Sequence, residues 1–241
     1  MNRASRQRYC HFAASFGLLA ACFIFRNGLT RTMALHMLVH IPLILLAGVL
    51  AGWAVTIGKG TDGRTDSDCA ARRFAAQCAR QYADCNEYGI AGLLFVSFMG
   101  AYWMIPKALD QVLVSPALSA CKFAGLYLAG IVLFDSLRRS NAVIRLFFLG
   151  NFCWMTAIVG MLYQSDSQRL CNFYLLGDQE WAGRGLVAIA VLLPLAWLFA
   201  ERRSIRGFCR GAPGGLPDQP PSSNQNQEGT WTQRRTHRVR M

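Results

Sequence analysis

Six long apolar blocks constrain the fold of this chain more than any other feature of its sequence. Most of them contain about 20 residues, the length at which a helix crosses the hydrocarbon core of a bilayer. Because long continuous apolar runs form membrane helices rather than the short alternating strands of a barrel, we expect an all-α, polytopic transmembrane helix bundle with about six spans. The blocks lie near residues 11–26, 33–57, 89–107, 116–136, 144–163 and 183–200.

The composition changes after the sixth block, which divides the chain into a transmembrane helical domain, 1–201, and a tail, 202–241. The tail is rich in Pro, Gly, Ser, Gln and Arg. A segment of this composition cannot bury enough apolar surface to fold. We therefore expect a disordered, basic tail.

The first apolar block has two interpretations. It follows Arg3, Arg6 and Arg8, as the short apolar core of a signal peptide follows a charged start. Phe25 and Arg26 end the run without a clear small-residue cleavage pattern. We favour an uncleaved first helix and keep cleavage as the alternative.

The distribution of basic residues predicts the orientation of the bundle. The chain has 25 Lys and Arg against 13 Asp and Glu, a formal net charge of +12. With six spans and the N-terminus inside, most of the Lys and Arg in the short loops fall on the inner side, as the positive-inside rule requires. Both termini are therefore expected in the cytoplasm, and the charge implies contact with a lipid bilayer rather than with nucleic acid. On this topology Cys69, Cys78 and Cys85 share a cytoplasmic loop, where thiols stay reduced; with the opposite orientation, a disulfide is expected in this loop.

Two histidines open the second block, in the run Met33-Ala-Leu-His36-Met37-Leu-Val-His40. Histidine is costly in a lipid-embedded segment and marks a candidate functional site. A separation of four residues places both side chains on one face of a helix. Met33 and Met37 each precede a histidine by three residues, and two imidazoles with two thioethers suit copper best.

The expected topology gathers further soft and polar side chains at the same end of the bundle. Packing is the simpler interpretation of the methionines, because Met is a common apolar residue, and buried packing is also expected for Cys22 and Cys153. The additional candidates at this end are Met104, Cys121, Asp110, Asp178 and Gln179.

Three motifs resemble those of the CtaG family, membrane assembly factors for copper-containing cytochrome oxidases. They occur in the family's order and cover about 33–200. The family has an HMxQHM-type helix start, a Trp-His-x-Pro segment followed by Asp, and an Asp-Gln-Gln-x-x-Gly helix start. The corresponding segments are His36-Met37-Leu38-Val39-His40-Ile41, Trp103-Met104-Ile105-Pro106 with Asp110, and Asp178-Gln179-Glu180-Trp181-Ala182-Gly183.

The chain departs from the family pattern at several ligand positions. Val39 stands where the family has Gln, and Met104 stands where it has His. The family's His-x-x-Glu-His start of the next helix corresponds to Ser119-Ala120-Cys121-Lys122, which has neither His nor Glu. Met and Cys preserve soft-metal binding, especially for Cu(I), whereas a protonated lysine binds no metal.

The resemblance implies a multi-pass protein of a bacterial inner membrane that binds copper, as Cu(I), near the outer face and supports maturation of a haem-copper oxidase. Its expected partners are an oxidase subunit or a copper donor protein. His36 and His40 would be the primary ligands, Met37 and Met104 auxiliary thioethers, and Met33 and Cys121 further helpers. Asp110, Asp178 and Gln179 would lie beside the ligands or at the entrance of the site.

Other function classes remain open from the sequence. A transporter or channel for copper or a small solute is one, and a structural membrane subunit without a ligand is another. A b-type haem protein is disfavoured because axial histidines must approach iron from opposite sides, and His36 and His40 share one face. An enzyme is not expected, because we find no Ser/His/Asp set and no phosphate-binding glycine loop in a strand–helix context.

Overall fold

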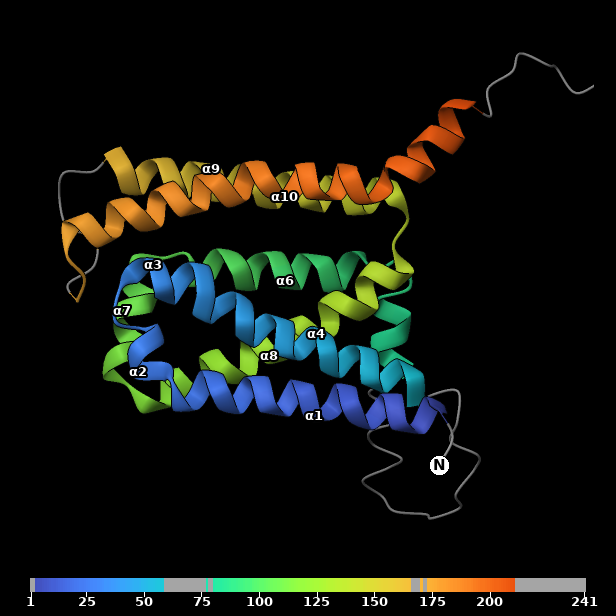
Figure 1. Ribbon diagram of the computed structural model, residues 1–241, viewed down its shortest axis with the longest axis horizontal. Helices are drawn as coiled ribbons and strands as arrows, with labels where there is room; N and C mark the ends of the chain where they lie inside the picture. The colour runs from blue at the N-terminus through green and yellow to red at the C-terminus, as the bar shows by residue number, and fades with distance from the viewer. Residues whose placement is uncertain (1–2, 59–76, 78–79, 166–169, 171–172, 211–241) are drawn as a thin grey trace, which may run out of the picture. The chain divides into compact units, whose positions relative to one another are not determined.

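The protein is all-α, as the apolar blocks predict. The computed structural model describes residues 3–58, 77, 80–165, 170 and 173–210, and this part of the chain contains helices and turns but no strand. Residues 80–85 form a further helical stretch. The elements in chain order are α1 (Arg3–Ile24), α2 (Arg26–Leu29), α3 (Met33–Leu35), the π-helical segment η1 (His36–His40), α4 (Ile41–Gly58), α6 (Ile90–Trp103), α7 (Pro106–Val114), α8 (Pro116–Arg139), α9 (Ala142–Ser165) and α10 (Leu176–Arg210) (Figure 1).

Four helical segments of the described chain are long and apolar enough to cross a membrane. A fifth span is formed if α6 and α7, which meet at an angle of 75°, are counted as one broken span. The protein is therefore a multi-pass membrane protein. The four segments are Met33–Ile57, Pro116–Arg139, Ala142–Ser165 and Leu176–Ala200.

Two of the six expected blocks do not form single straight candidate spans. Most of the block at 11–26 lies in α1, which is not among the candidate spans, because its N-terminal part carries Arg3, Arg6 and Arg8 and leaves only a short apolar stretch. The block at 89–107 is not one straight helix. Pro106 restricts Ile105 to an extended conformation (φ −77°, ψ 124°) and starts α7 as its first residue, as proline does at a helix start.

The chain divides into two units, Met1–Leu198 and Phe199–Met241. Helix α10 continues to Arg210, into the segment that the composition predicts to be disordered. The rest of that segment, 211–241, lies outside the described residues, as do Cys69, Cys78 and Cys171.

Small residues bring the helices of the first unit close together. Gly48 of α4 and Gly130 of α8 face each other so closely that a Cβ on Gly48 would overlap the Tyr127 carbonyl oxygen and lie 2.9 Å from the Gly130 Cα. Close approach at small residues is the usual way in which membrane helices pack. Helix α1 lies along α4, and the Ser15 hydroxyl donates to the Ala47 carbonyl at 2.7 Å.

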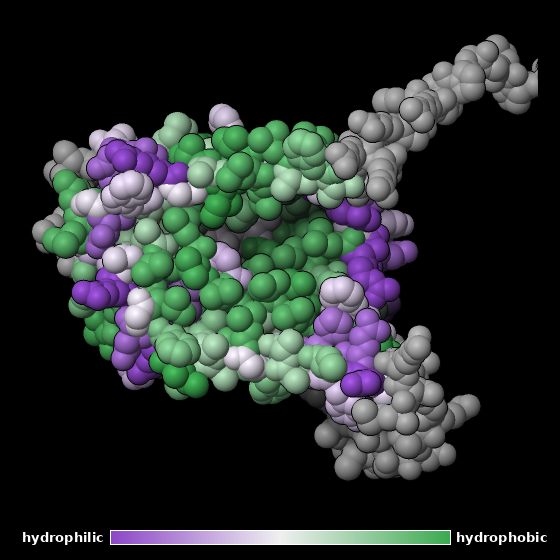
Figure 2. Space-filling model, in the orientation of Figure 1, coloured by the Kyte–Doolittle hydropathy of each residue, from purple (hydrophilic) through white to green (hydrophobic). Residues whose placement is uncertain are grey.

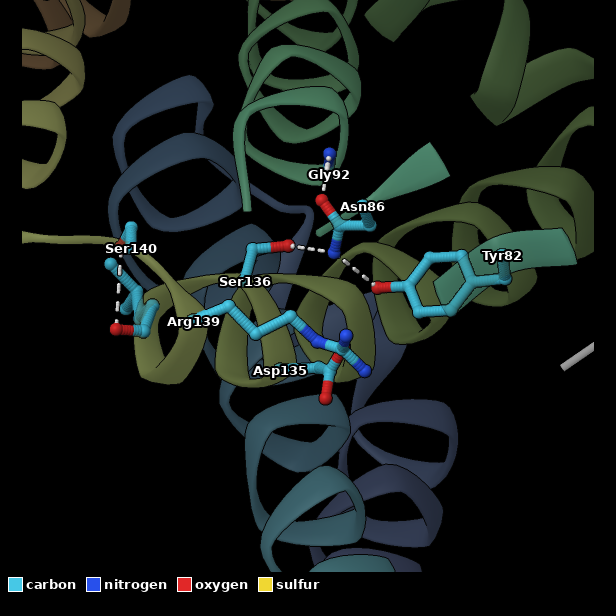
Figure 3. Close-up of polar contacts among 8 residues, drawn as sticks. Tyr82, Asn86, Gly92, Asp135, Ser136, Arg139 and Ser140 are labelled. Carbon is cyan, nitrogen blue, oxygen red and sulfur yellow. Dashed lines mark hydrogen bonds and ion pairs between the residues drawn. The ribbon is translucent and has the colours of Figure 1, made fainter. Parts of the chain in front are cut away.

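A polar network ties α6 to the C-terminal part of α8 (Figure 3). The Asn86 side-chain amide donates to the hydroxyl oxygens of Ser136 and Tyr82, each at 2.9 Å, and its carbonyl accepts from the Gly92 amide at 2.9 Å. Gly89 adopts a left-handed conformation (φ 76°) against the Ser136 carbonyl. This network provides an acceptor for the Gly92 amide in the first turn of α6, so we interpret it as structural.

The surface of the first unit is that of a membrane protein. Figure 2 shows a broad hydrophobic band with hydrophilic residues gathered at its two ends. Large apolar side chains remain exposed within the spans, including Phe147 (68% exposed) and Trp154 (69%) of α9. Lipid contact explains this exposure, because water would not favour so large an apolar surface.

Candidate functional site

The two histidines lie on a π-helical segment at the start of the first long span. The Thr32 side chain caps α3 by accepting from the Leu35 amide at 3.2 Å. From His36 to His40 the backbone is π-helical, and the Ile41 amide donates to the His36 carbonyl. The sequence predicts an α-helix here, and the local widening is a correction. Single π-helical turns occur frequently at functional sites.

Both imidazoles contact one basic side chain from α8. Lys122 Nζ lies 3.0 Å from His36 Nε2 and 3.4 Å from His40 Nδ1. His36 and His40 have no exposed surface, and Lys122 is 1% exposed. Because the lysine nitrogen is the donor, each imidazole accepts through a lone pair, and the two lone pairs converge on the same atom. We call these three residues the His–Lys–His cluster.

A directed chain of hydrogen bonds continues from His36. Its Nδ1 lies 2.9 Å from the Tyr174 hydroxyl, and that hydroxyl donates to the Thr30 carbonyl at 3.2 Å. A hydroxyl has a single hydrogen, so Tyr174 must accept from His36 Nδ1–H. This assigns the tautomer of His36 and leaves Nε2 as the acceptor for Lys122. The side chain therefore has a defined partner at each ring nitrogen.

The His40 ring makes different contacts from the His36 ring. Its ring packs edge-on against Phe123, with the ring centroids 5.4 Å apart. Since Nδ1 accepts from Lys122, Nε2 carries the hydrogen. This nitrogen is buried without a hydrogen bond of ordinary geometry, although the backbone of Cys22 on α1 interacts with the ring. The second ring nitrogen of His40 is therefore associated with the Cys22 backbone.

The methionine candidates gather in an apolar cluster beside the histidines. Met33 is fully buried and Met37 is 6% exposed, and both pack in one cluster with Tyr174. Met104 is partly buried and packs against the same cluster. The predicted gathering of these three methionines is therefore present, and Tyr174 links their cluster to His36.

Cys121 does not join the histidines. It is exposed on α8, although its neighbour Lys122 is buried. Consecutive residues of an α-helix point about 100° apart, so only one of the two can face the imidazoles. Cys22, which the sequence assigns only to packing, is the buried cysteine close to the cluster.

The three polar candidates occupy other positions in the bundle. Asp110 is buried in α7. Asp178 is partly buried in the first turn of α10. Gln179 is 2% exposed, and its side chain donates to the Tyr163 carbonyl at 3.2 Å and accepts from the Leu170 amide at 3.0 Å. Gln179 therefore holds the start of α10 against α9 rather than the histidines.

A cavity of about 190 Å³ opens beside the His–Lys–His cluster. Helix α2, the C-terminal end of α7 and the first turns of α8 surround it. Apolar residues of α7 and α8 form one part of its wall. Its polar lining consists of Arg26, Asn27, Thr30, His40, Ser119 and Lys122.

Sequence reasoning missed Lys122, Tyr174 and Arg26 as members of the site. The sequence could have identified Lys122, because it is a charged residue inside an apolar block and such residues mark functional positions. No sequence pattern identifies Tyr174 or Arg26, since only the packing of α2 and of the segment before α10 brings them near His36 and His40. Within the described residues, no group of three or more His, Cys, Asp and Glu side chains is placed to hold a metal ion.

Comparison with known proteins adds no relative: no protein-family model, no curated protein and no solved structure matches this chain.

Proposed function

We propose that this multi-pass membrane protein binds Cu(I) at His36 and His40 and supports maturation of a haem-copper cytochrome oxidase. The observation that carries the proposal is the convergence of two buried imidazole lone pairs on one atom, Lys122 Nζ, at 3.0 and 3.4 Å. A pair of imidazoles arranged to hold a shared positive group is also suited to a metal cation. The oxidase role rests on the resemblance of the three motifs to the CtaG family.

In this proposal His36 Nε2 and His40 Nδ1 are the copper ligands. Lys122 occupies the place between them, so it must move away before copper binds. Met37, Met33 and Met104 pack in the neighbouring cluster and supply the thioethers that favour Cu(I). Cys121 is not included in the ligand set, because it is exposed elsewhere on α8.

Lys122 would help the proposed site to release its copper. When protonated it competes with copper for the same two nitrogens. A ligand set of two histidines with a built-in competitor holds copper less tightly than a closed cage does. An assembly factor needs such exchange, because it must pass its copper to an oxidase subunit. The proposed location is the outer face of a bacterial inner membrane, with a copper donor protein as a second partner.

The direct test of this function is a strain that lacks the protein. We expect reduced oxidase activity, with less copper in the purified oxidase, and recovery when copper is added to the medium. Complementation with the His36→Ala/His40→Ala variant should fail, whereas the His11→Ala variant should restore activity, because His11 stacks on Trp53 away from the cluster. Normal copper content and activity in the deletion strain would overturn the proposal.

Transport of a small solute is the second candidate function. A cavity that reaches two buried basic side chains, His40 and Lys122, favours it, because ionisable groups within spans commonly line solute pathways. Uptake of copper or of a small anion into vesicles, compared with binding by the detergent-solubilised protein, distinguishes the two functions. Saturable flux that His36→Ala abolishes would favour the carrier.

A further inference from the structure

The cavity beside the His–Lys–His cluster carries a positive potential that a copper site does not explain. Arg26 contributes a permanently charged guanidinium and lines the cavity with Lys122. No acidic side chain of the described residues is part of this lining. The cavity is therefore suited to an anion rather than to a cation.

The start of α8 adds to this potential. Ser115 caps the helix, and Pro116 and Ser119 of its first turn line the cavity. The N-terminus of a helix carries partial positive charge, which favours bound phosphates and carboxylates. The Ser119 hydroxyl supplies one more group that can donate to an oxygen.

A buried lysine distinguishes this site from a charged patch of surface. Lys122 is 1% exposed, yet it lines the cavity. Its ammonium nitrogen lies within hydrogen-bond distance of the two imidazoles and carries three hydrogens. One hydrogen is therefore left for an acceptor oxygen in the cavity.

We propose that the cavity binds a phosphate group, with Arg26 and Lys122 as its donors. Arginine and lysine are the residues that most often recognise phosphate oxygens. A volume of about 190 Å³ admits one such group. Leu113, Val114 and Phe123 flank it with apolar surface, so the phosphate can belong to a phospholipid headgroup or to a free ion. The proposal does not require copper, although the cavity shares Lys122 and His40 with the proposed copper site.

Binding of two probes to the full-length protein tests this site. Inorganic phosphate is titrated against the protein in neutral detergent at constant ionic strength, with the thermal unfolding midpoint as readout. Phosphatidylglycerol is offered in phosphatidylcholine nanodiscs, with lipid retention after solubilisation as readout. We expect saturable binding of at least one probe. A response to phosphate identifies a free ion, and a response to phosphatidylglycerol alone identifies a headgroup.

Arg26→Gln and Arg31→Gln are the matched variants. Both arginines are exposed, so neither change disturbs the core, but only Arg26 lines the cavity. Arg26→Gln should weaken binding at least about tenfold through loss of a charge-assisted hydrogen bond, and Arg31→Gln should leave it unchanged. Absence of saturable binding of both probes would overturn the proposal. So would equal binding by the two variants.

Discussion

Both ring nitrogens of His36 have buried partners, and these partners come from distant parts of the chain. Lys122 approaches from α8, and Tyr174 approaches from the segment before α10. Burying a polar group without a hydrogen-bond partner in a membrane costs free energy. The hydrogen bonds to Lys122 and Tyr174 therefore fix the orientation and the tautomer of the His36 ring. His36 is consequently prepared to present Nε2 as a lone-pair donor, which is the state that a metal ligand requires.

Removing the Tyr174 hydroxyl should therefore destabilise the protein. Tyr174→Phe leaves His36 Nδ1–H and the Thr30 carbonyl without their partner. We expect the free energy of unfolding to fall by about 1–3 kcal/mol, measured by chemical denaturation of the protein in detergent. Tyr88→Phe is the control, because Tyr88 is 65% exposed and its loss should have no effect. Equal stability of both variants would contradict the hydrogen-bond chain.

At this scale the sequence predicts part of the site. The spacing of four residues correctly places His36 and His40 on one side of their helix, where both reach Lys122. The choice between Cys121 and Lys122 could not be made from the sequence, because it depends on the rotation of α8 against α4. Copper binding itself stays a prediction.

At the scale of elements, proline marks a helix break that the hydropathy pattern does not reveal. The apolar run at 89–107 predicts one span, yet Pro106 restricts the preceding residue and separates α6 from α7 at an angle of 75°. The π-helical turn at His36–His40 has no comparable sequence signal.

Contact between α4 and α8 depends on glycine, because the two backbones meet at Gly48 and Gly130. A Cβ in Gly48→Ala would overlap backbone atoms of α8 that cannot give way. We expect a loss of about 1–3 kcal/mol of stability and a displacement of Lys122 relative to the histidines.

Gly17→Ala in α1 provides the contrast for this prediction. No atom lies within 4 Å of the position that the alanine Cβ would take. The stability of the protein should therefore rise by about 0.5–1 kcal/mol, because alanine loses less conformational freedom than glycine on folding. Denaturation of both variants in the same detergent measures the difference. A neutral Gly48→Ala would contradict the close approach of α4 and α8.

For the whole molecule, the number of crossings depends on α1. This helix is not among the candidate spans, but it packs along α4. The His11 ring stacks on Trp53 near one end, and Ser15 bonds to Ala47 further along. A helix that accompanies a spanning helix in this way shares its depth in the bilayer. We therefore expect α1 to cross the membrane with α4.

Reporter fusions check this topology. If α1 crosses and the α6–α7 pair counts as one span, both termini lie on the same side, and the positive-inside rule places that side in the cytoplasm. Green fluorescent protein fused at either end should then fluoresce, and alkaline phosphatase at either end should be inactive. Activity of phosphatase at one terminus would show an odd number of crossings and contradict this topology.

The central claim is that His36 and His40 form one cation-binding pair that Lys122 competes for. The most direct measurement is the Cu(I) affinity of the purified full-length protein, determined under reducing conditions by competition with a chromophoric chelator. We expect His36→Ala/His40→Ala to lose stoichiometric binding, His11→Ala to keep it, and Lys122→Leu, which adds no metal ligand, to bind Cu(I) more tightly than the unmodified protein. The same Cu(I) stoichiometry and affinity in the double histidine variant and the unmodified protein would contradict the claim.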